Sequence, residues 1–497
     1  MVLATIFSYK FFPLALIFVF GASLVFQIAH LTTTSLWHDE AFSALLIQYE
    51  DYGEMLHRIA LDVHPPLYYM ILRLWSGFAG DSLFSLRFFS LFFGLLCVAL
   101  TFLLAKDIFQ NKKLALVSAL VLGMSSFQIQ YHLEARMYTL GAFFLLLATY
   151  FLLRGLKAQI PSNRFFLFMG IYALCAVAAL YTHYYTVFGI FAHALFIIYW
   201  VGPHLKKLLF AGTAFAAIGF LFLPWLPTFL RQLSQVQDAY WIPPITKWSL
   251  PTTISNMVIG DGLAPHQAAL VIIAINIFVA AALITTLWHY QHREKWMFAL
   301  LFVIPFLGSV LLSMKTSIYL YRYFVLYLPF LITALIAAAF AIPQKQIRFA
   351  ILTILVLGSA ISYPIHWYVW DLQDKPGMQE ASSYIISSVK PNDKIISNSP
   401  FVYFTFRYYN TSYIHPLLYA PDDLPHFSGT ALLNPEDTLQ TFDIAETGDT
   451  VWTIDTTGFG NLQPTVPTSW QKQEEKEFPD AYIHRGSIIV RKYLIDT

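Results

Sequence analysis

Long runs of apolar residues fill the first three quarters of the chain. A run of about 18 or more apolar residues is long enough to cross a bilayer as a helix. The pattern predicts about eleven transmembrane helices. They lie near residues 11–31, 83–105, 114–131, 137–153, 165–181, 184–201, 208–226, 267–288, 296–313, 319–342 and 348–364.

The pattern changes near Trp367, where charged and polar residues return together with Pro and Gly. One amphipathic helix and three strands follow from the periodicity of this part. A helix followed by strands predicts a small α/β domain. The helix is expected at 379–390 and the strands at 393–397, 451–455 and 487–494.

Positive charge marks one side of the predicted spans. Lys10, Lys106, Lys112, Lys113, Arg154, Lys157, Lys206, Lys207, Arg293 and Lys345 all fall in loops on that side. Under the positive-inside rule these loops and the N-terminus are cytoplasmic. An odd number of spans then places the C-terminal part outside. We predict a transmembrane domain, 1–366, with a first external loop at 32–82, and an extracytoplasmic α/β domain, 367–497, in a multi-pass protein of the cell (inner or plasma) membrane.

The composition excludes several other classes of protein. The chain of 497 residues is 57% hydrophobic and only 12% charged, whereas soluble proteins carry roughly a quarter charged residues. A soluble multidomain enzyme or a disordered chain is therefore excluded. The net charge of +1 gives no electrostatic footprint for nucleic acid. Cys97 and Cys175 lie in apolar runs and offer neither a disulfide framework nor a CxxC metal site.

The first external loop begins with Trp37-His38-Asp39-Glu40. A carboxylate at a membrane surface is a candidate general base, since burial and a neighbouring charge raise its pKa. The alternative is a charged pair that ends a helix at the interface. Farther along, two prolines follow His64 and fix the start of the next helix. His64 could bind a phosphate or a metal there, or simply cap the helix.

Three further external turns carry unusual residues. Glu134, Arg136 and Tyr138 form one turn, where an arginine can bind a phosphate with two hydrogen bonds or pair with Glu134. Tyr181, His183 and Tyr184 form another, which suits either a sugar site or an interfacial aromatic belt. Lys315 and Arg322 put positive charge on the outer side, and Tyr323 lies beside Arg322 in the sequence. Their partner is an anionic lipid head group or phosphate, or else lipid head groups in general.

All these residues fall on the same predicted face, which indicates a single external active site. The chain contains no P-loop, no HExxH motif and no dinucleotide-binding glycine pattern. Transport driven by ATP, zinc proteolysis and nicotinamide chemistry therefore have no support. A transporter or flippase of lipid-linked sugars is the alternative, although its charges would be expected near the bilayer midplane.

The ordered motifs resemble those of the GT-C membrane glycosyltransferases. Within these, the chain looks most like the protein O-mannosyltransferase and aminoarabinose transferase branch, and especially the bacterial family-39, RgtA/B/C/D-like glycosyltransferases. The resemblance covers about residues 1–365, and 399–409 (SPFVYFTFRYY) is matched more loosely. The matching strings are WHDEAFS (37–43), HPPLYY (64–69), EARMYTL (134–140), YTHYY (181–185) and YRYFVLYLPF (321–330).

The resemblance implies a GT-C fold and a sugar donor linked to polyprenyl phosphate. It also implies inverting transfer to a hydroxyl on the extracytoplasmic side, with Asp39 as the catalytic base and Glu40 beside it. The acceptor would lie on a protein, a lipid A-like lipid or a cell-wall glycan. His64, Arg136, Lys315 or Arg322 would stabilise the leaving phosphate. Some relatives use a divalent cation and others do not; Asp39, Glu40 and His64 could hold one, but no ligand spacing requires it.

Overall fold

The chain folds as two compact units in the computed structural model, which describes residues 12–238, 241–261, 264–369, 377–458, 466–480 and 486–495. Lys10 and the first residue of the first predicted span lie outside the described residues. Unit 1 contains Met1–Ile28, His64–Tyr68 and Arg87–His366. Unit 2 contains Ala29–Val63, Tyr69–Leu86 and Trp367–Thr497. Most of the first external loop thus clusters with the C-terminal region, although the sequence analysis grouped it with the spans.

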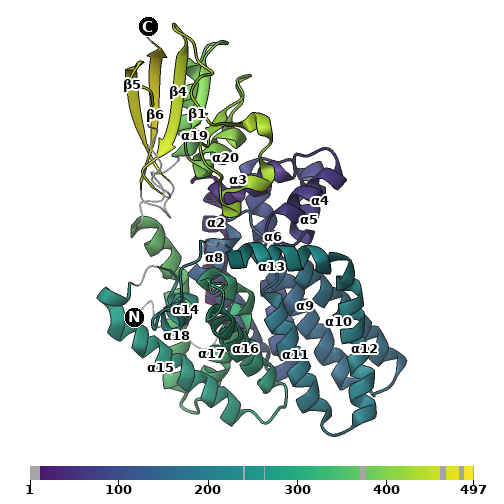
Figure 1. The fold of residues 1–497 in the computed structure, drawn as a ribbon. Coiled ribbons are helices and arrows are strands. Elements are labelled where there is room, and N and C mark those ends of the chain that lie inside the picture. The colour runs from purple at the N-terminus through teal and green to yellow at the C-terminus, as the bar shows by residue number, and fades with distance from the viewer. Residues whose placement is uncertain are drawn as a thin grey trace. The chain divides into compact units, whose positions relative to one another are not determined.

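Helices build unit 1 (Figure 1). They are α2 (Phe12–Ala29), α6 (Leu83–Phe109), α7 (Lys112–Met124), α8 (Ser126–His132), α9 (Tyr138–Lys157), α10 (Asn163–Thr182), α11 (Thr186–Val201), α12 (Leu205–Phe222), α13 (Leu226–Asp238), α14 (Ser249–Ile259), α15 (Pro265–His289), α16 (Lys295–Ser313), α17 (Leu328–Ala341) and α18 (Lys345–Val369), with 3-10 turns η1 (Leu223–Trp225) and η2 (Tyr321–Tyr327).

The apolar helices account for the predicted spans. Among the described residues, eight helices are long and apolar enough to cross a membrane. The pair α7 and α8 passes the same test together and is bent by 58°, as a broken span or a re-entrant loop. Leu14–Ala29 and α11 are shorter apolar helices. The prediction of a polytopic helical membrane protein is therefore confirmed, with eight to nine spans by length and composition among the described residues.

A buried polar network holds α8 at the bend. His132, at the end of α8, lies 2.7 Å from Gln27 through Nδ1 and 3.0 Å from Gln128 through Nε2. Gly94 lies beside its ring, and any larger residue there would collide with it. Since an unpaired polar group in a membrane interior costs several kcal/mol, these contacts fix the end of α8. They set the direction of the turn that carries Glu134 and Arg136.

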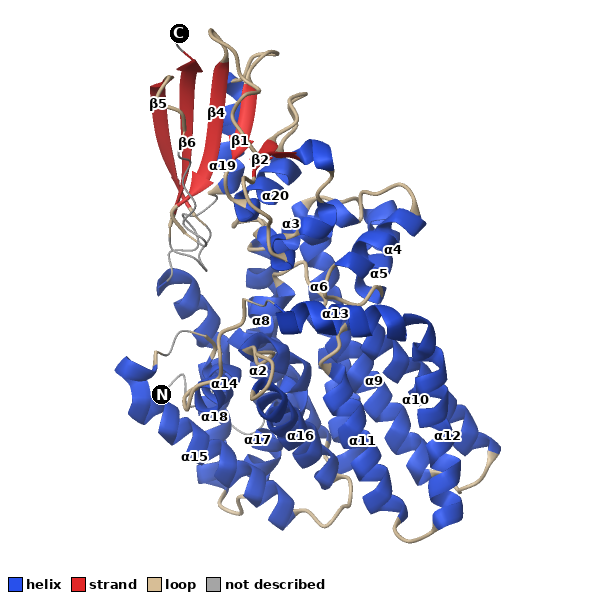
Figure 2. Ribbon diagram, in the orientation of Figure 1, coloured by secondary structure: helices blue, strands red, loops and turns tan. Residues whose placement is uncertain are grey.

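Unit 2 combines short helices of the first external loop with an α/β domain (Figure 2). Its sheet has the order β3-β2-β1-β4-β6-β5. The strands β3, β2, β1 and β4 are parallel to one another, and β6 runs antiparallel to both of its neighbours, β4 and β5. The elements are α3 (His38–Leu46), α4 (Tyr52–Leu61), α5 (Leu67–Ala79), α19 (Met378–Ser388), β1 (Lys394–Ser397), α20 (Pro400–Tyr409), β2 (Leu417–Tyr419), β3 (Thr438–Leu439), β4 (Thr450–Thr456), β5 (Trp470–Pro479) and β6 (Ser487–Ile495), with 3-10 turns η4 (His426–Ser428), η5 (Thr430–Leu432) and η6 (Pro435–Asp437).

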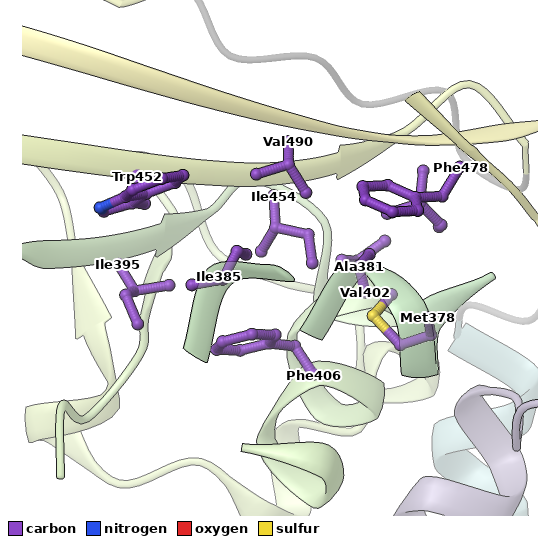
Figure 3. Packing of buried hydrophobic residues seen from close by; sticks show 11 residues of the cluster. Met378, Ala381, Ile385, Ile395, Val402, Phe406, Trp452, Ile454, Phe478 and Val490 are labelled. Carbon is purple, nitrogen blue, oxygen red and sulfur yellow. The ribbon is translucent and has the colours of Figure 1, made fainter. Parts of the chain in front are cut away.

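Helices α19 and α20 cover one face of this sheet with an apolar core (Figure 3). Trp452 and Ile454 of β4 project into it, where they meet Ile385 of α19 and Phe406 of α20. The alternate residues of β4 face the other side, where Val451 packs with Trp470 and Tyr493. Both faces of β4 are buried because it lies in the middle of the sheet.

The sheet also contains a strand that the sequence analysis did not predict. β5 reads WQKQEEKEFP, and its charged residues point to solvent on both faces. Its sequence lacks the alternation of apolar and polar residues that a half-buried strand shows, because β5 lies at one edge of the sheet. Its pairing with β6 is supported by an ion pair between Glu475 and Arg491 at 2.7 Å. Charged side chains on an edge strand oppose pairing with another chain.

Candidate functional site

Unit 1 brings His64 together with the turn between α8 and α9. A guanidinium nitrogen, Nη2 of Arg136, lies 3.4 Å from Nε2 of His64. Arginine can only donate, so this contact makes Nε2 the acceptor and leaves the proton of a neutral imidazole on Nδ1. Arg136 is only 2% exposed. The two residues predicted to bind phosphate are thus neighbours, although they are 72 positions apart in the chain.

His183, between α10 and α11, joins this pair. Its Nδ1 accepts the N–H of Tyr185 at 3.2 Å, so a neutral ring carries its proton on Nε2. Nε2 is buried and has no hydrogen-bond partner in the described part of the chain. Burial holds the pKa of His183 well below its usual range, and electrostatic interaction with the neighbouring His64 and Arg136 side chains lowers it further. His183 is therefore a neutral ring with a buried donor that awaits an acceptor.

Aromatic rings surround His183. The ring of Tyr323 lies 4.8 Å from it and that of Tyr138 5.7 Å, both measured between centroids. Tyr185 packs against Tyr323 at 4.7 Å. These rings exclude water from one side of the histidine, and a donor is worth more to an anion in a water-poor site than in solution. Tyr138 and Tyr323 were both predicted site residues.

A hydrogen-bonded chain supports His64 from α13. Gln232 is 1% exposed, and its Nε2 donates to the carbonyl of His64 at 3.3 Å. The hydroxyl of Tyr184 donates to Gln232 Oε1 and accepts from Nε1 of Trp225 at 2.8 Å. The sequence analysis found Tyr184 but not Gln232 or Trp225. For Gln232, the only signal in the sequence was a glutamine in the polar part of an amphipathic helix.

The remaining predicted residues of unit 1 lie in different surroundings. Glu134 is buried in its turn, and Arg322 lies with its guanidinium 5.4 Å from the ring centre of Trp241. Both are within electrostatic range of Tyr321, whose hydroxyl donates to Asp261. Tyr181 donates to the carbonyl of Leu221. The described contacts do not connect the exposed Lys315 to the His64–Arg136–His183 cluster.

Unit 2 carries the acidic motif at the start of α3. Trp37 precedes the helix, and its N–H donates to Oε2 of Glu40 at 3.3 Å. Glu40 is completely buried, whereas Asp39 is half-buried at the second position of the helix. A carboxylate that accepts the amide before a helix stabilises the start of that helix. The geometry thus separates the two acids: Glu40 fixes the backbone, and Asp39 is the more accessible carboxylate.

Helix α20 packs against α3 within unit 2. The ring of His38 lies 4.8 Å from that of Phe401 and 5.7 Å from that of Phe404. The N–H of Leu36 donates to the hydroxyl of Tyr409 at 3.0 Å. The string 399–409, which the sequence analysis matched only loosely, thus forms the support of the acidic motif.

Arg58 of α4 makes a second connection between the first loop and the C-terminal region. Its guanidinium donates to the carbonyls of Ala431 and Leu433 and to Oδ1 of Asn434, the last at 2.6 Å. Its Nε also pairs with Glu54 at 2.6 Å. One planar fork thereby engages three acceptors of a single loop, which suits the geometry of arginine.

A metal site was an expectation for Asp39, Glu40 and His64. In the part of the chain that the structure describes, no three His, Cys, Asp or Glu side chains gather closely enough to hold a metal ion. Asp39 and Glu40 belong to unit 2 and His64 to unit 1. The His64–Arg136–His183 cluster offers hydrogen-bond donors, which suit an anion rather than a cation. Neither unit by itself therefore shows a metal site among its described residues, and a divalent cation stays an expectation.

Comparison with known proteins places the fold. Residues 63–227 match the family described as dolichyl-phosphate-mannose-protein mannosyltransferase, which is less than half of the chain. No curated protein matches the sequence. The crystal structure of ArnT from Cupriavidus metallidurans in the apo state is similar, with a TM-score of 0.64 and 11% identity over 95% of this chain and 97% of that one.

A second structure of ArnT from the same organism, bound to undecaprenyl phosphate, has a TM-score of 0.60 and 12% identity over the same shares of the two chains. At this level of identity the likeness concerns the fold. The protein therefore has the GT-C fold that its motifs predicted, and its apolar helices make it a multi-pass membrane protein.

Proposed function

We propose that this protein is a glycosyltransferase that moves a sugar from a polyprenyl-phosphate donor to an acceptor hydroxyl at the extracytoplasmic surface of the cell membrane. The observation that carries the proposal is the His64–Arg136–His183 cluster, with Arg136 and His183 buried, in a GT-C fold. The ArnT structure bound to undecaprenyl phosphate supports the same class of lipid donor. The family match over 63–227 supports it further, since that range includes all three residues of the cluster.

The cluster suits the leaving group of this reaction. When the bond between the anomeric carbon and the phosphate oxygen breaks, the negative charge on the polyprenyl phosphate increases. Arg136 would bind the phosphate oxygens through two N–H groups, and His183 would donate from Nε2. Donors that are already in place cost no reorganisation during the reaction, which is why such groups stabilise transition states strongly. Arg322 and Lys315 would contribute charge at longer range.

Asp39 is the proposed general base. The acceptor oxygen attacks the anomeric carbon from the side opposite the phosphate, and its proton passes to the Asp39 carboxylate. The new glycosidic bond forms as the bond to phosphate breaks, so the anomeric configuration inverts. Glu40 would hold the start of α3, since its carboxylate already accepts the Trp37 amide. These proposed steps use only protein side chains.

Asp39→Asn in the full chain tests this assignment. Membranes that contain the variant are supplied with labelled polyprenyl-phosphate sugars, and the label in new glycosidic bonds is counted. We expect transfer to fall by about 10²–10⁴-fold, because a positioned base contributes a factor of that size. Donor binding should be unchanged, since Asp39 does not hold the phosphate in this proposal.

Three outcomes would contradict the proposal in different ways. Full transfer by Asp39→Asn removes that residue as the base. Labelled lipid that crosses the membrane without any new glycosidic bond favours the flippase alternative. Loss of transfer on addition of EDTA, restored by a divalent cation, means that a metal takes part. Glu40→Gln is the matched control, and it should affect the stability of α3 more than the chemistry.

A further inference from the structure

The sheet of unit 2 has a topological switch point between β1 and β4. From β1 the chain continues through α20 to β2, which lies on one side of β1. β4 lies on the other side, and from it the chain continues to β5 and β6 farther in that direction. In open sheets of this kind, ligands bind beyond the carboxyl ends of the strands at the switch point. Asn398 and Ser399 follow β1 there, and Asp455 lies near the end of β4.

Three polar side chains at this point each carry an atom that makes no hydrogen bond of normal geometry within the described residues. Asp455 is fully buried, and its Oδ1 accepts the N–H of Asn398 at 3.0 Å. Its Oδ2 is such an atom, and the nearby Thr453 hydroxyl interacts with the same carboxyl group. Oδ1 of Asn398 and Oγ of the fully buried Ser399 are the other two. Most buried polar atoms are paired, so three such atoms on adjacent groups need an explanation.

Neighbouring polar groups show that poor packing is not the reason. The hydroxyl of Thr456 donates to Asp480 at 2.6 Å and accepts the N–H of Gly458 at 2.8 Å. The hydroxyl of Ser397 accepts the N–H of Ser399 at 3.2 Å and donates to its carbonyl at 3.1 Å. The unpartnered atoms, together with Oγ1 of the buried Thr453, thus lie beside polar groups that are fully hydrogen-bonded.

The charge state of Asp455 is consistent with a binding role. Burial raises its pKa to about 7, although the Asn398 amide and the Arg491 charge both act to lower it. Near neutral pH the carboxyl group is therefore present in both forms. Its protonated form both donates and accepts hydrogen bonds. Buried carboxyl groups with raised pKa values are common at functional sites.

The chemistry of these atoms selects the ligand. Phosphates and carboxylates offer only acceptors, so they would be repelled by the ionised form of Asp455 and would find no proton on Asn398 Oδ1. A divalent cation requires several oxygen ligands and more charge than one carboxyl group provides. Sugar hydroxyls both donate and accept, so they match all three side chains. We propose that Asp455, Asn398 and Ser399 form a saccharide-binding site at the β1–β4 switch point.

This site deepens the proposed function, on which the identity of its ligand rests: the saccharide is part of the acceptor. Ser399 directly precedes α20, and the body of α20 supports the acidic motif through Phe401, Phe404 and Tyr409. One helix thus connects the proposed acceptor site with the loop that carries the proposed base. An acceptor held there would be bound by the unit that also holds Asp39.

Binding can be measured on the full chain in lipid nanodiscs without any donor lipid. The probes are mannotriose, chitotriose and xylotriose, and the readouts are saturation-transfer NMR and hydrogen exchange of peptides from 394–410 and 450–458. We expect at least one trisaccharide to bind and to slow exchange in both peptides. Asp455→Asn and Ser399→Ala should weaken that binding by about tenfold or more, since each removes a hydrogen bond to the ligand.

Asp393→Asn is the matched control. Asp393 is also a buried acid of this domain, but its Oδ2 already accepts from Lys390 N–H and Trp452 Nε1. This variant should bind the trisaccharide like the parent protein. Hydrogen exchange in β6 reports whether each variant is folded.

The site is refuted if no trisaccharide protects either peptide, or if folded Asp455→Asn and Ser399→Ala both bind normally; the three atoms would then hold structural water. The two proposals can fail separately. Transfer to a natural acceptor with no trisaccharide bound refutes the site alone. Saccharide binding in a protein that never transfers sugar from any lipid donor refutes the enzymatic function alone.

Discussion

The two units each contain a buried polar cluster, and the clusters are opposite in chemistry. In unit 1 the unsatisfied atom is a donor, the Nε2–H of His183, close to the charge of Arg136. In unit 2 it is a pair of acceptors, Asp455 Oδ2 and Asn398 Oδ1, accompanied by the Ser399 hydroxyl. A donor cluster suits a phosphate, and an acceptor cluster suits a hydroxyl. In the proposed reaction, the phosphate is the leaving group of the donor, and the hydroxyls bound by unit 2 belong to the saccharide of the acceptor.

The largest expected effect concerns Asp455 and the stability of unit 2. Its folded pKa of about 7 lies above the ordinary value of 3.8, so between these values the folded state holds a proton that the unfolded state has lost. The contribution of Asp455 to the free energy of unfolding is therefore greatest below about pH 4, and it falls as the pH rises to about 7. The full penalty is on the order of 4 kcal/mol, given 1.36 kcal/mol per pKa unit. Asp455→Asn should remove it.

Hydrogen exchange of β4 and β6 amides in the full chain measures this difference. At pH 8 we expect slower exchange in Asp455→Asn than in the parent protein, and at pH 4.5 similar exchange in both. Equal exchange at pH 8 would mean that Asp455 ionises without cost. Residues that serve binding often lower the stability of their own domain, and we expect Asp455 to do so.

The second prediction separates the hydrogen-bond donor of His183 from the packing of its ring. His183→Phe keeps an aromatic ring between Tyr138 and Tyr323 but removes the Nε2 donor, whereas His183→Gln keeps a donor. We expect the phenylalanine variant to bind polyprenyl phosphate about tenfold to a hundredfold more weakly, the range for a hydrogen bond to a charged group. The glutamine variant should retain most of the affinity. If both variants bind equally, His183 does not contact the phosphate.

The smallest effect tests the support of the acidic motif by α20. Tyr409→Phe removes the acceptor of the Leu36 N–H, a loss of about 1 kcal/mol. We expect kcat for sugar transfer to fall a few-fold while KM for the donor stays constant, because the proposed phosphate ligands belong to unit 1. Tyr413→Phe is the control, since the side chain of Tyr413 is fully exposed. A change in donor KM alone would contradict a role in positioning Asp39.

Periodicity in the sequence predicted the apolar spans well. Each apolar run has enough length to specify its own helix, so the spans need no information from elsewhere in the chain. His64 and Arg136 were predicted to act together because both fall on the same predicted external face, and the structure puts them 3.4 Å apart. His183 was expected only as support, and the position of its proton became clear from the Tyr185 amide.

The rest depended on contacts that no local pattern contains. Leu36 and Tyr409 are 373 positions apart, and nothing in either segment indicates the other. Gln232 looks like a solvent-facing residue of an amphipathic helix, although it is buried against the backbone of His64. Asp455 reads as a polar residue at the end of a strand. Its burial depends on neighbours that periodicity does not report.

The charged edge strand of the sheet affects how neighbouring copies of the protein meet in a membrane. Molecules anchored in the same plane meet far more often, and in a narrower range of orientations, than molecules that tumble in solution. A bare strand edge displayed on each copy would then be a template for chains of paired sheets. Since β5 carries charges on both faces, another strand could dock there only by dehydrating them. The strand with the least apolar sequence in the domain thus helps to keep crowded copies separate.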